Sequence, residues 1–318
     1  MRITKERKLL LQQGLTRTMT GSELFHRYYF ILEEIAKELQ DSHLKEVSLS
    51  ANKILLKTKD DITLNYSFGD VGMLSQWLIL PETEKYEKQV IDCILNHISK
   101  EKEEFTFFDI GANIGWYSFS VGKKYPACKV YSFEPAPKSY EQILINSRLN
   151  NLTNITPVNI GFAESPGEKE FFFCEEIQTA SSLADTLQNT AKKKILCKFD
   201  TVNNFCKTHC SYPDFIKCDV EGAEYLVIQG ALEIIQQHKP VLMLEMLRKW
   251  MRCFHVHPND VINELKNIGY KCYSVSPQTA LLTHVPFVDE NTSETNFFFL
   301  HTEAHSNILD CLTEEKKI

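Results

Sequence analysis

The densest group of chemically capable side chains is a block of acids directly after a short apolar run. The run covers residues 215–220, and Asp219, Glu221 and Glu224 stand at its end and just after it, with Gly222 permitting a sharp turn among them. Carboxylates this close together cost free energy unless a cation, a metal ion or a proton offsets their charge. An acid in the first turn of a helix is also typical without any ligand, which suits Glu224 better than Asp219. The block therefore indicates acid–base chemistry or a cationic ligand.

A glycine-containing loop follows an earlier apolar run over residues 106–110. Glycine lets a backbone approach a ligand closely, and the amides of the helix that begins after the loop point into the same space. Asn113 stands where the dinucleotide fingerprint has its second glycine, and Asp109 before the loop would repel a pyrophosphate and attract an ammonium or sulfonium. We therefore expect an adenosine-containing cofactor here, bound by Asp109, Gly111, Ala112, Asn113 and Gly115.

Further candidates stand at the ends of three other apolar runs. Glu134 follows Gly111 at close to the ~20-residue interval of an acid that accepts hydrogen bonds from ribose hydroxyls. Gly161 and Phe162 end the next run, where the same geometry places the adenine ring, although Phe162 suits a core position equally well. Glu245 ends the run after the acid block. In a parallel sheet these residues converge on one cleft beyond the carboxyl ends of the strands.

Strand-like runs alternate with helical patterns from residue 105 onward, and this alternation must position the candidate residues. It predicts an α/β fold with a mostly parallel sheet that is covered by helices on both faces. Strands are expected over residues 106–110, 129–133, 155–160, 215–220, 241–246, 271–275 and 296–301, with two extra strands over 168–174 and 195–199. Helices are expected over residues 116–123, 139–149, 224–235 and 259–268.

The first hundred residues carry no chemical constellation of their own. Their apolar spacing predicts a helix over 20–40, a hairpin over 47–66 with its turn at 59–61, and a helix over 84–98. We expect three parts in the chain, namely an accessory region over 1–104, the α/β core over 105–303 and a polar tail over 304–318. The apolar stripe of the first helix could cover an acceptor pocket or form a homodimer.

Composition excludes several classes of protein. The chain has 318 residues, of which 43% are hydrophobic and 24% charged, so it is neither mostly disordered nor fibrous. A net charge of -7 argues against a nucleic-acid partner. No apolar run is long enough for a membrane span, and the stretch behind the basic N-terminus is too short for a signal peptide, so we expect a cytoplasmic protein. The ten cysteines lack a CxxC pair and are expected as reduced thiols.

Taken together, these motifs resemble the FkbM family of S-adenosylmethionine-dependent methyltransferases. The resemblance rests on FFDIGANIGWYSF (107–119), YSFEPAP (131–137), NIGFAESPGEKEF (159–171), TASSL (179–183) and IKCDVEGAEYLVIQGA (216–231). It implies the class I methyltransferase fold, a Rossmann-like three-layer sandwich whose seven-stranded sheet has an antiparallel last strand. It also implies S-adenosylmethionine as the cofactor, S-adenosylhomocysteine as the product, and methyl transfer to oxygen, often a hydroxyl of a sugar or a natural product.

The resemblance also implies roles for the candidate residues. The glycine loop would hold the methionine end of the cofactor and Glu134 the ribose, while Asp219 and Glu221 would face the methyl group and the acceptor. One of these acids would orient and deprotonate the acceptor hydroxyl. The expected catalytic residues are Asp219, Glu221 and Glu245, with His255 and His257 behind the fifth strand as alternative bases.

Three alternatives stay open. Asp219 and Glu245 at adjacent strand ends could hold Mg²⁺, although we expect a site without a metal because solvated or paired acids are the commoner state. An NAD(P)-dependent oxidoreductase shares the strand, the glycine loop and the distal acid, but it would require the missing glycine and would disfavour Asp109. A non-catalytic nucleotide-binding module could retain the same fold. No motif distinguishes a glycan acceptor from another small molecule.

Overall fold

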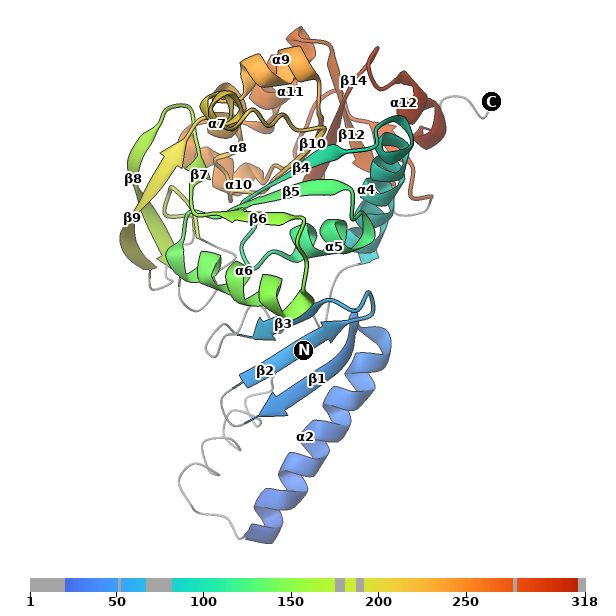
Figure 1. Cartoon of the computed structure of the whole chain (residues 1–318), viewed down its shortest axis with the longest axis vertical. Helices are drawn as coiled ribbons and strands as arrows, with labels where there is room; N and C mark the ends of the chain where they lie inside the picture. The colour runs from blue at the N-terminus through green and yellow to red at the C-terminus, as the bar shows by residue number, and fades with distance from the viewer. Residues whose placement is uncertain are drawn as a thin grey trace. The chain divides into compact units, whose positions relative to one another are not determined.

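The computed structural model describes residues 21–50, 53–66, 82–174, 181–186, 192–276 and 279–313 (Figure 1). The chain divides into two compact units, residues 1–80 and residues 81–318. The helix expected over 84–98 forms as α4 (Glu82–Glu101) and belongs to the larger unit, because it contacts β12 (Tyr270–Val275) and α12 (Ser306–Leu312). The division between compact units therefore falls before this helix, whereas the boundary expected from the sequence lies at residue 104.

In the smaller unit a helix precedes a three-stranded antiparallel sheet, one strand more than the expected hairpin. The elements are α2 (Gly21–Asp41), β1 (Leu44–Ser50), β2 (Lys53–Thr58) and β3 (Thr63–Tyr66). The turn from β2 to β3 lies at residues 59–61, as predicted, and Asp61 there has a left-handed φ of 62°. Residue 20, at the predicted start of α2, lies outside the described residues. None of the helices described in either unit is long and apolar enough to cross a membrane.

The larger unit is built on an eight-stranded sheet that confirms the predicted fold class. Its strand order is β13-β12-β14-β11-β10-β4-β5-β6. The last strand along the chain, β14, runs antiparallel to both of its neighbours, and the short β13 adds an edge to the expected seven strands. The remaining strands are β4 (Phe105–Ile110), β5 (Cys128–Phe133), β6 (Ile155–Val158), β10 (Phe215–Cys218), β11 (Val241–Glu245), β13 (Leu282–His284) and β14 (Asn296–His301).

Helices cover both faces of this sheet (Figure 1). One face carries α4, α5 (Trp116–Lys124) and α6 (Pro137–Asn150). The other face carries α7 (Val202–His209), α8 (Glu224–Gln229), α9 (Leu232–His238) and α11 (Pro258–Asn267). On that second face Phe108, Phe133, Phe162 and Phe205 form an aromatic cluster with ring centroids 4.6–5.8 Å apart. Phe162, for which the sequence left two roles open, is therefore a core residue that also reaches the cleft described below.

The two extra strands predicted between the third and fourth sheet strands form a small sheet of their own. Its members are β7 (Gly161–Phe162), β8 (Gly167–Cys174) and β9 (Lys192–Asp200), in the order β7-β9-β8. Phe171, Phe173 and Phe199 are buried and belong to a separate hydrophobic cluster. The small sheet begins directly after β6, so it stands beside the carboxyl ends of the main strands.

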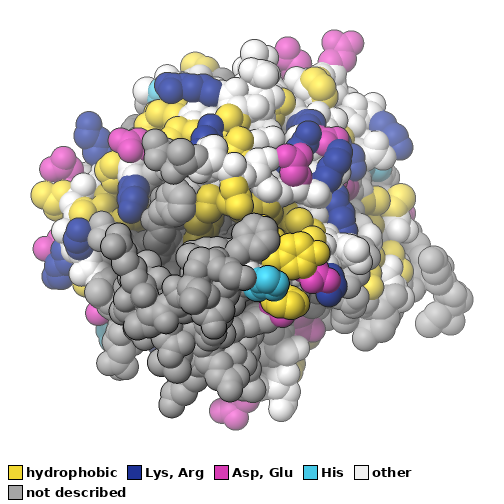
Figure 2. Space-filling model, turned by 90° about the horizontal axis from the view of Figure 1, so that it is seen from below, with side chains coloured by type: hydrophobic (Ala, Val, Ile, Leu, Met, Phe, Trp, Pro, Cys, Tyr) yellow, Lys and Arg dark blue, Asp and Glu magenta, His cyan; other side chains and the backbone are white. Residues whose placement is uncertain are grey.

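Lys, Arg, Asp and Glu side chains are interspersed on the molecular face drawn in Figure 2, with hydrophobic side chains between them. This mixture agrees with a chain in which 35 basic residues stand against 42 acidic ones. On α2, Tyr29 and Phe30 are each 59% exposed. Their ring centroids lie 6.2 Å apart, and exposed apolar side chains of this kind define no site by themselves.

Candidate active site

The glycine loop between β4 and α5 packs against the end of β10. Gly111 has a φ of 75°, and a Cβ atom added there would lie 1.9 Å from the backbone oxygen of Asp219. The amides of Gly111 and Ala112 both donate to the carbonyl of Phe133 at the end of β5, at 3.0 Å. Gly115, with a φ of 88°, precedes the first residue of α5. The loop is thus held between two strand ends, and a residue without a Cβ atom is required at position 111.

Glu134, at the end of β5, ties this loop to the next one. Its Oε2 atom accepts from the amide of Asn113 and its Oε1 atom from the amide of Ala136, each at 2.9 Å. Glu134 is only 6% exposed, and this burial raises the pKa of its carboxyl to about 7. Each carboxylate oxygen keeps a second lone pair, so Glu134 can still accept a hydrogen bond from a ligand hydroxyl.

One cleft brings most of the predicted residues together. It encloses about 660 Å³, including the part open to solvent. The predicted residues that line it are Gly111, Asn113, Glu134, Gly161, Phe162, Asp219 and Glu221. The sequence missed a wall contributed by the small sheet and its loop, formed by Phe171, Ser181, Leu183 and Phe199. Alternation in β8 and β9 marks the two phenylalanines as inward-facing, but no local signal says that they face this cleft.

Asp109 does not line the cleft but lies beneath the glycine loop, with 1% exposure. Its Oδ2 atom accepts from the amide and the hydroxyl of Ser118 in α5, at 3.0 and 2.6 Å. Its Oδ1 atom lies 3.7 Å from the ammonium of Lys217. The cation that this carboxylate attracts in the structure is therefore a side chain of the protein itself.

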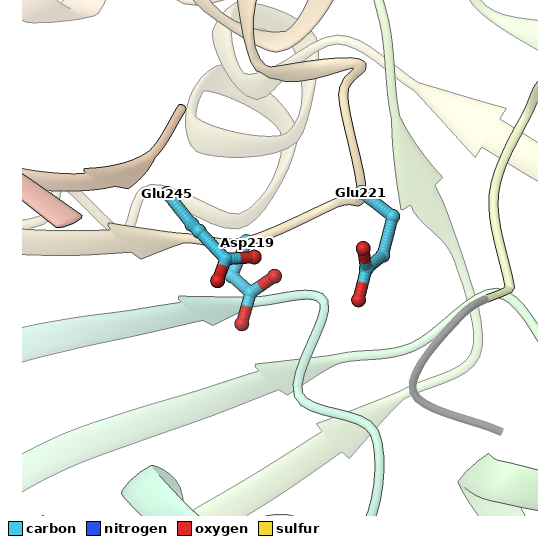
Figure 3. Close-up of side chains that lie close together, drawn as sticks. All are labelled: Asp219, Glu221 and Glu245. Atoms are coloured by element: carbon cyan, nitrogen blue, oxygen red, sulfur yellow. The ribbon is translucent and has the colours of Figure 1, made fainter. Parts of the chain in front are cut away.

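Three carboxylates from two neighbouring strand ends meet beside the cleft (Figure 3). Asp219 and Glu221 follow β10 and Glu245 ends β11, and one oxygen from each lies within 4.8 Å of the others. Burial, together with the negative charge of these neighbours, raises the pKa of Glu221 and Glu245 well above the usual range of a glutamate. The structure therefore brings these three acids together.

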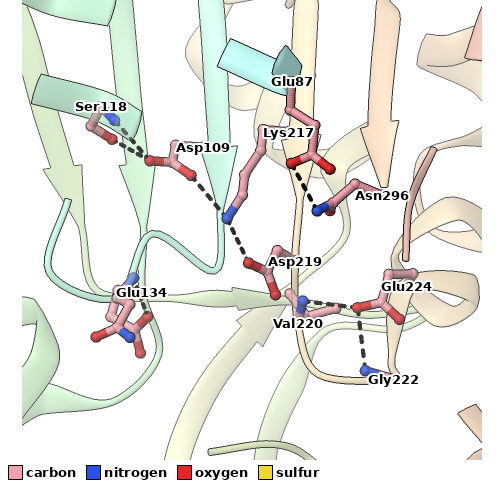
Figure 4. Close-up of polar contacts among 11 residues, drawn as sticks. Glu87, Asp109, Ser118, Glu134, Lys217, Asp219, Val220, Gly222, Glu224 and Asn296 are labelled. Carbon is pink, nitrogen blue, oxygen red and sulfur yellow. Dashed lines mark hydrogen bonds and ion pairs between the residues drawn. The ribbon is translucent and has the colours of Figure 1, made fainter. Parts of the chain in front are cut away.

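Glu224 has a structural place in the same loop. It is fully buried, and its Oε1 atom accepts from the amides of Val220 and Gly222 at 2.9 and 3.2 Å (Figure 4). Burial raises the pKa of its carboxyl to about 7. Ser182 adds a hydrogen bond from its hydroxyl to the carbonyl of Glu221 at 2.9 Å. The loop that presents the acids is thus fixed from both sides, and Glu224 supports it from within the protein.

The two histidines considered as alternative bases lie at helix boundaries. His257 caps α11, because its Nδ1 atom accepts from the amide of Asn259 at 3.2 Å while Asp260 accepts from the amide of His257. His255 has a φ of 56° and ends the short 3₁₀ helix Arg252–Phe254. The His257 ring is therefore engaged as a helix cap.

The cleft presents acceptors that suit a positively charged ligand with hydroxyl groups. Among the described residues, Asn113 Oδ1 and Glu221 Oε2 are buried atoms that lack a hydrogen-bond partner, and both residues line the cleft. A buried acceptor without a partner is costly, so a ligand that donates to it is stabilised. These acceptors therefore fit an ammonium and ribose hydroxyls as donors, and the carboxylates fit the positive charge of a sulfonium.

A sheet with this strand order, with a glycine loop after β4 and acids after β5 and β10, has the class I methyltransferase fold. The model of the methyltransferase FkbM domain matches residues 109–272. The chain belongs to the FkbM methyltransferase family.

Two fungal methyltransferases are among the curated relatives. Methyltransferase sdnD of Sordaria araneosa is 28% identical over 156 residues, which cover 39% of this chain and 60% of that protein. Methyltransferase 1 of Beauveria bassiana is 22% identical over 167 residues, which cover 47% of this chain and 67% of that protein. The chain therefore spans about two thirds or less of the length of these relatives.

Among solved structures, the FkbM methyltransferase of Methylobacillus flagellatus matches with a TM-score of 0.39 and 16% identity. That match covers 74% of this chain and 62% of the other. A methyltransferase of Agrobacterium tumefaciens matches with a TM-score of 0.41 and 10% identity, over 79% of this chain and 70% of the other.

Proposed function

We propose that this methyltransferase acts on a hydroxyl oxygen of a sugar, a glycan or a natural product. The observation that carries the proposal is the cluster of Asp219, Glu221 and Glu245 at the cleft, because methylation of a hydroxyl requires removal of its proton. The sulfonium of S-adenosylmethionine supplies an electrophilic methyl group. The protein has to hold the acceptor oxygen in line with that group and accept one proton.

Several residues that line the cleft would hold the cofactor. Glu134 would accept hydrogen bonds from the ribose hydroxyls, and Asn113 Oδ1 would accept from the ammonium of the methionine end. Phe171, Leu183 and Phe199 offer apolar contact to the adenine ring. Asp109 would act indirectly, by fixing the start of α5 under the glycine loop.

Glu221 is the best placed of the three acids to accept the proton. It lines the cleft, and its buried Oε2 atom has no partner among the described residues. Its raised pKa makes it a stronger base than an ordinary glutamate, and a cationic ligand nearby keeps it ionised. Asp219 has one oxygen bound by Lys217 at 3.1 Å and would orient the acceptor, with Glu245 behind it.

The proposal is tested by calorimetry and by an acceptor screen. S-adenosylmethionine and S-adenosylhomocysteine should bind and NAD should not displace them. A panel of hydroxylated sugars and natural products is then incubated with the protein and the donor, and mass spectrometry should show a gain of one methyl group. A chelator should not reduce this activity. Methylation confined to amine or carbon acceptors would contradict the proposed hydroxyl acceptor. Loss of activity on chelation would indicate that a metal ion takes part in the reaction.

Binding of S-adenosylhomocysteine should weaken as the pH falls through about 7. The ionised carboxylate of Glu134 is the form that accepts ribose hydrogen bonds, and protonation at a pKa of about 7 removes that form. Below that pH the affinity should drop by up to about tenfold per pH unit. Calorimetry between about pH 5.5 and 8.5 checks this, and Glu134→Gln, which lacks the ionisable group, should show a weaker and flatter profile.

The free energy of unfolding of the unliganded protein should change with pH in the opposite direction to the ligand affinity. The contribution of these carboxyls to stability decreases as the pH rises, which provides a control. Glu134 and Glu224 have a pKa of about 7 when folded and near 4.5 otherwise. Their contribution is therefore fully present below about pH 4.5 and is lost as the pH rises through 7. Exposed Glu233 and Asp289, whose pKa is lowered, act below this window. Buried His305, whose pKa is lowered to about 4, acts in the opposite direction over the same window, so the check compares Glu134→Gln and Glu224→Gln with the unchanged protein. A pH dependence of the unfolding temperature that neither substitution changes would contradict these assignments.

A further inference from the structure

Lys217 is a buried cation in the middle of an apolar strand. It is 4% exposed, and the other residues of β10 are the apolar Phe215, Ile216 and Cys218. Burying an ammonium costs several kcal/mol unless nearby groups compensate its charge. Asp109 and Asp219 provide that compensation, at 3.7 and 3.1 Å from its Nζ atom (Figure 4).

Strand geometry places these three charges together. β10 runs parallel to β4 with Lys217 opposite Asp109, so both side chains emerge on the face covered by α5. Asp219 comes two residues after Lys217 and therefore points to the same side. The Lys217 ammonium also lies 5.1 Å from the ring centroid of Tyr117, at the start of α5. Lys217 therefore contacts both Asp109, which lies beneath the glycine loop, and Asp219, which belongs to the acid cluster at the cleft.

The contacts of Asp219 show what the lysine does at the site. The Asp219 side chain is 32% exposed, and it lines the cleft while its Oδ2 atom accepts from Lys217. The ion pair restricts the rotation of this carboxylate and offsets part of the negative charge of the cluster. Without the lysine, the acids would present a more negative potential to the cleft.

We propose that Lys217 is a positioning residue whose charge sets how strongly the site distinguishes the cationic methyl donor from the neutral product. S-adenosylmethionine carries a sulfonium and S-adenosylhomocysteine a neutral sulfur, so the two ligands differ in charge at the position facing the acids. This inference rests on the proposed placement of the cofactor sulfur beside Asp219. Partial neutralisation by Lys217 limits the preference for the donor, and excess negative charge would increase it.

The test compares the affinities of the two ligands by calorimetry at about pH 8.5, where neighbouring carboxyls take up fewer protons. Lys217→Met should raise the ratio Kd(S-adenosylhomocysteine)/Kd(S-adenosylmethionine) about tenfold, because one positive charge near the sulfur is lost. Asp219→Asn should lower the ratio by a similar factor. Lys217→Arg, which keeps the charge, should leave it within about twofold. Lys207→Met, at an exposed ion pair with Glu233, is the matched control and should leave it unchanged.

If Lys217 had a purely structural role, its loss would weaken the binding of both ligands equally. An unchanged ratio of the two dissociation constants in Lys217→Met would therefore overturn the proposal. If that variant does not fold, the same comparison is made between Asp109→Asn and the double variant Asp109→Asn/Lys217→Met, since removing both partners leaves no buried unpaired charge. The ratio should again rise about tenfold on loss of the lysine. Failure of the unmodified protein to bind either ligand would instead reject the proposed cofactor site.

Discussion

Glu221→Gln should reduce kcat for methyl transfer by about 10²–10⁴-fold, the usual contribution of a positioned base. The substitution keeps the size of the side chain and its backbone position, where Glu221 has a φ of 58°. It removes the group that can take the proton from the acceptor hydroxyl. The affinity for S-adenosylhomocysteine should change much less, because Glu134 and the glycine loop hold the rest of the ligand.

Companion variants divide the roles within the acid cluster. Asp219→Asn should also abolish turnover while cofactor binding persists in part, because the acceptor loses its orienting carboxylate. Glu245→Gln should have a smaller effect, since Glu245 does not line the cleft. Glu233→Gln, on the surface of α9, is the matched control and should retain full activity. Full activity of Glu221→Gln would remove this residue from the mechanism, and loss of turnover in Glu245→Gln alone would transfer the role to Glu245.

Gly111→Ala should destabilise the larger unit by about 3 kcal/mol or more and abolish cofactor binding. An alanine at a φ of 75° costs about 1–2 kcal/mol in backbone strain alone. In addition, its Cβ atom would stand 1.9 Å from the backbone oxygen of Asp219, so the glycine loop and the end of β10 would have to separate. Because the clash involves backbone on both sides, no side-chain rotation can relieve it.

Chemical denaturation and calorimetry with S-adenosylhomocysteine measure the two effects of Gly111→Ala. Gly167→Ala is the matched control, because Gly167 also has a positive φ, 138°, while an added Cβ atom there meets nothing within 4 Å. At a φ of 138° an alanine lies further from the regions that L residues adopt than at 75°, so the control carries a backbone cost at least as large but no clash, and it should keep ligand binding. Retained binding of S-adenosylhomocysteine by Gly111→Ala would mean that the loop yields at Gly111, contrary to the packing described for it.

The strand ends that carry the site residues could be predicted, because they depend on local sequence patterns. Each predicted acid directly follows an apolar run, and parallel strands bring their carboxyl ends to one edge of the sheet. Strand order alone therefore indicated a common location for these acids. In the structure they lie at one cleft or at its border, and they are Glu134, Asp219, Glu221 and Glu245. The glycine loop was recognisable for the same reason, since a strand, a glycine and a helix follow one another within a few residues.

The partners of each charge depended on contacts that are distant in the sequence. Asp109 looked like a ligand for an external cation, yet strand register sets it opposite Lys217, 108 positions further along. A lysine inside an apolar strand was a usable signal of such a pair, because an unpaired buried ammonium is unfavourable. The sequence allowed two roles for Glu224, as an acid of the site or as a structural acid in the first turn of a helix. Its burial against the amides of Val220 and Gly222 shows the structural role.

The sequence by itself determined the fold class, the family and the strand ends that carry the chemistry, because periodicity and motif spacing are properties of short segments. Only the tertiary structure decided which acids face the cleft and which ones hold the protein together. Asp109 and Glu224 are buried and accept hydrogen bonds from backbone amides beneath the loops, whereas Glu221 lines the cleft. The physical reason is that the role of a carboxylate depends on its solvation and its neighbours, and both are set by the register of strands far apart in the chain.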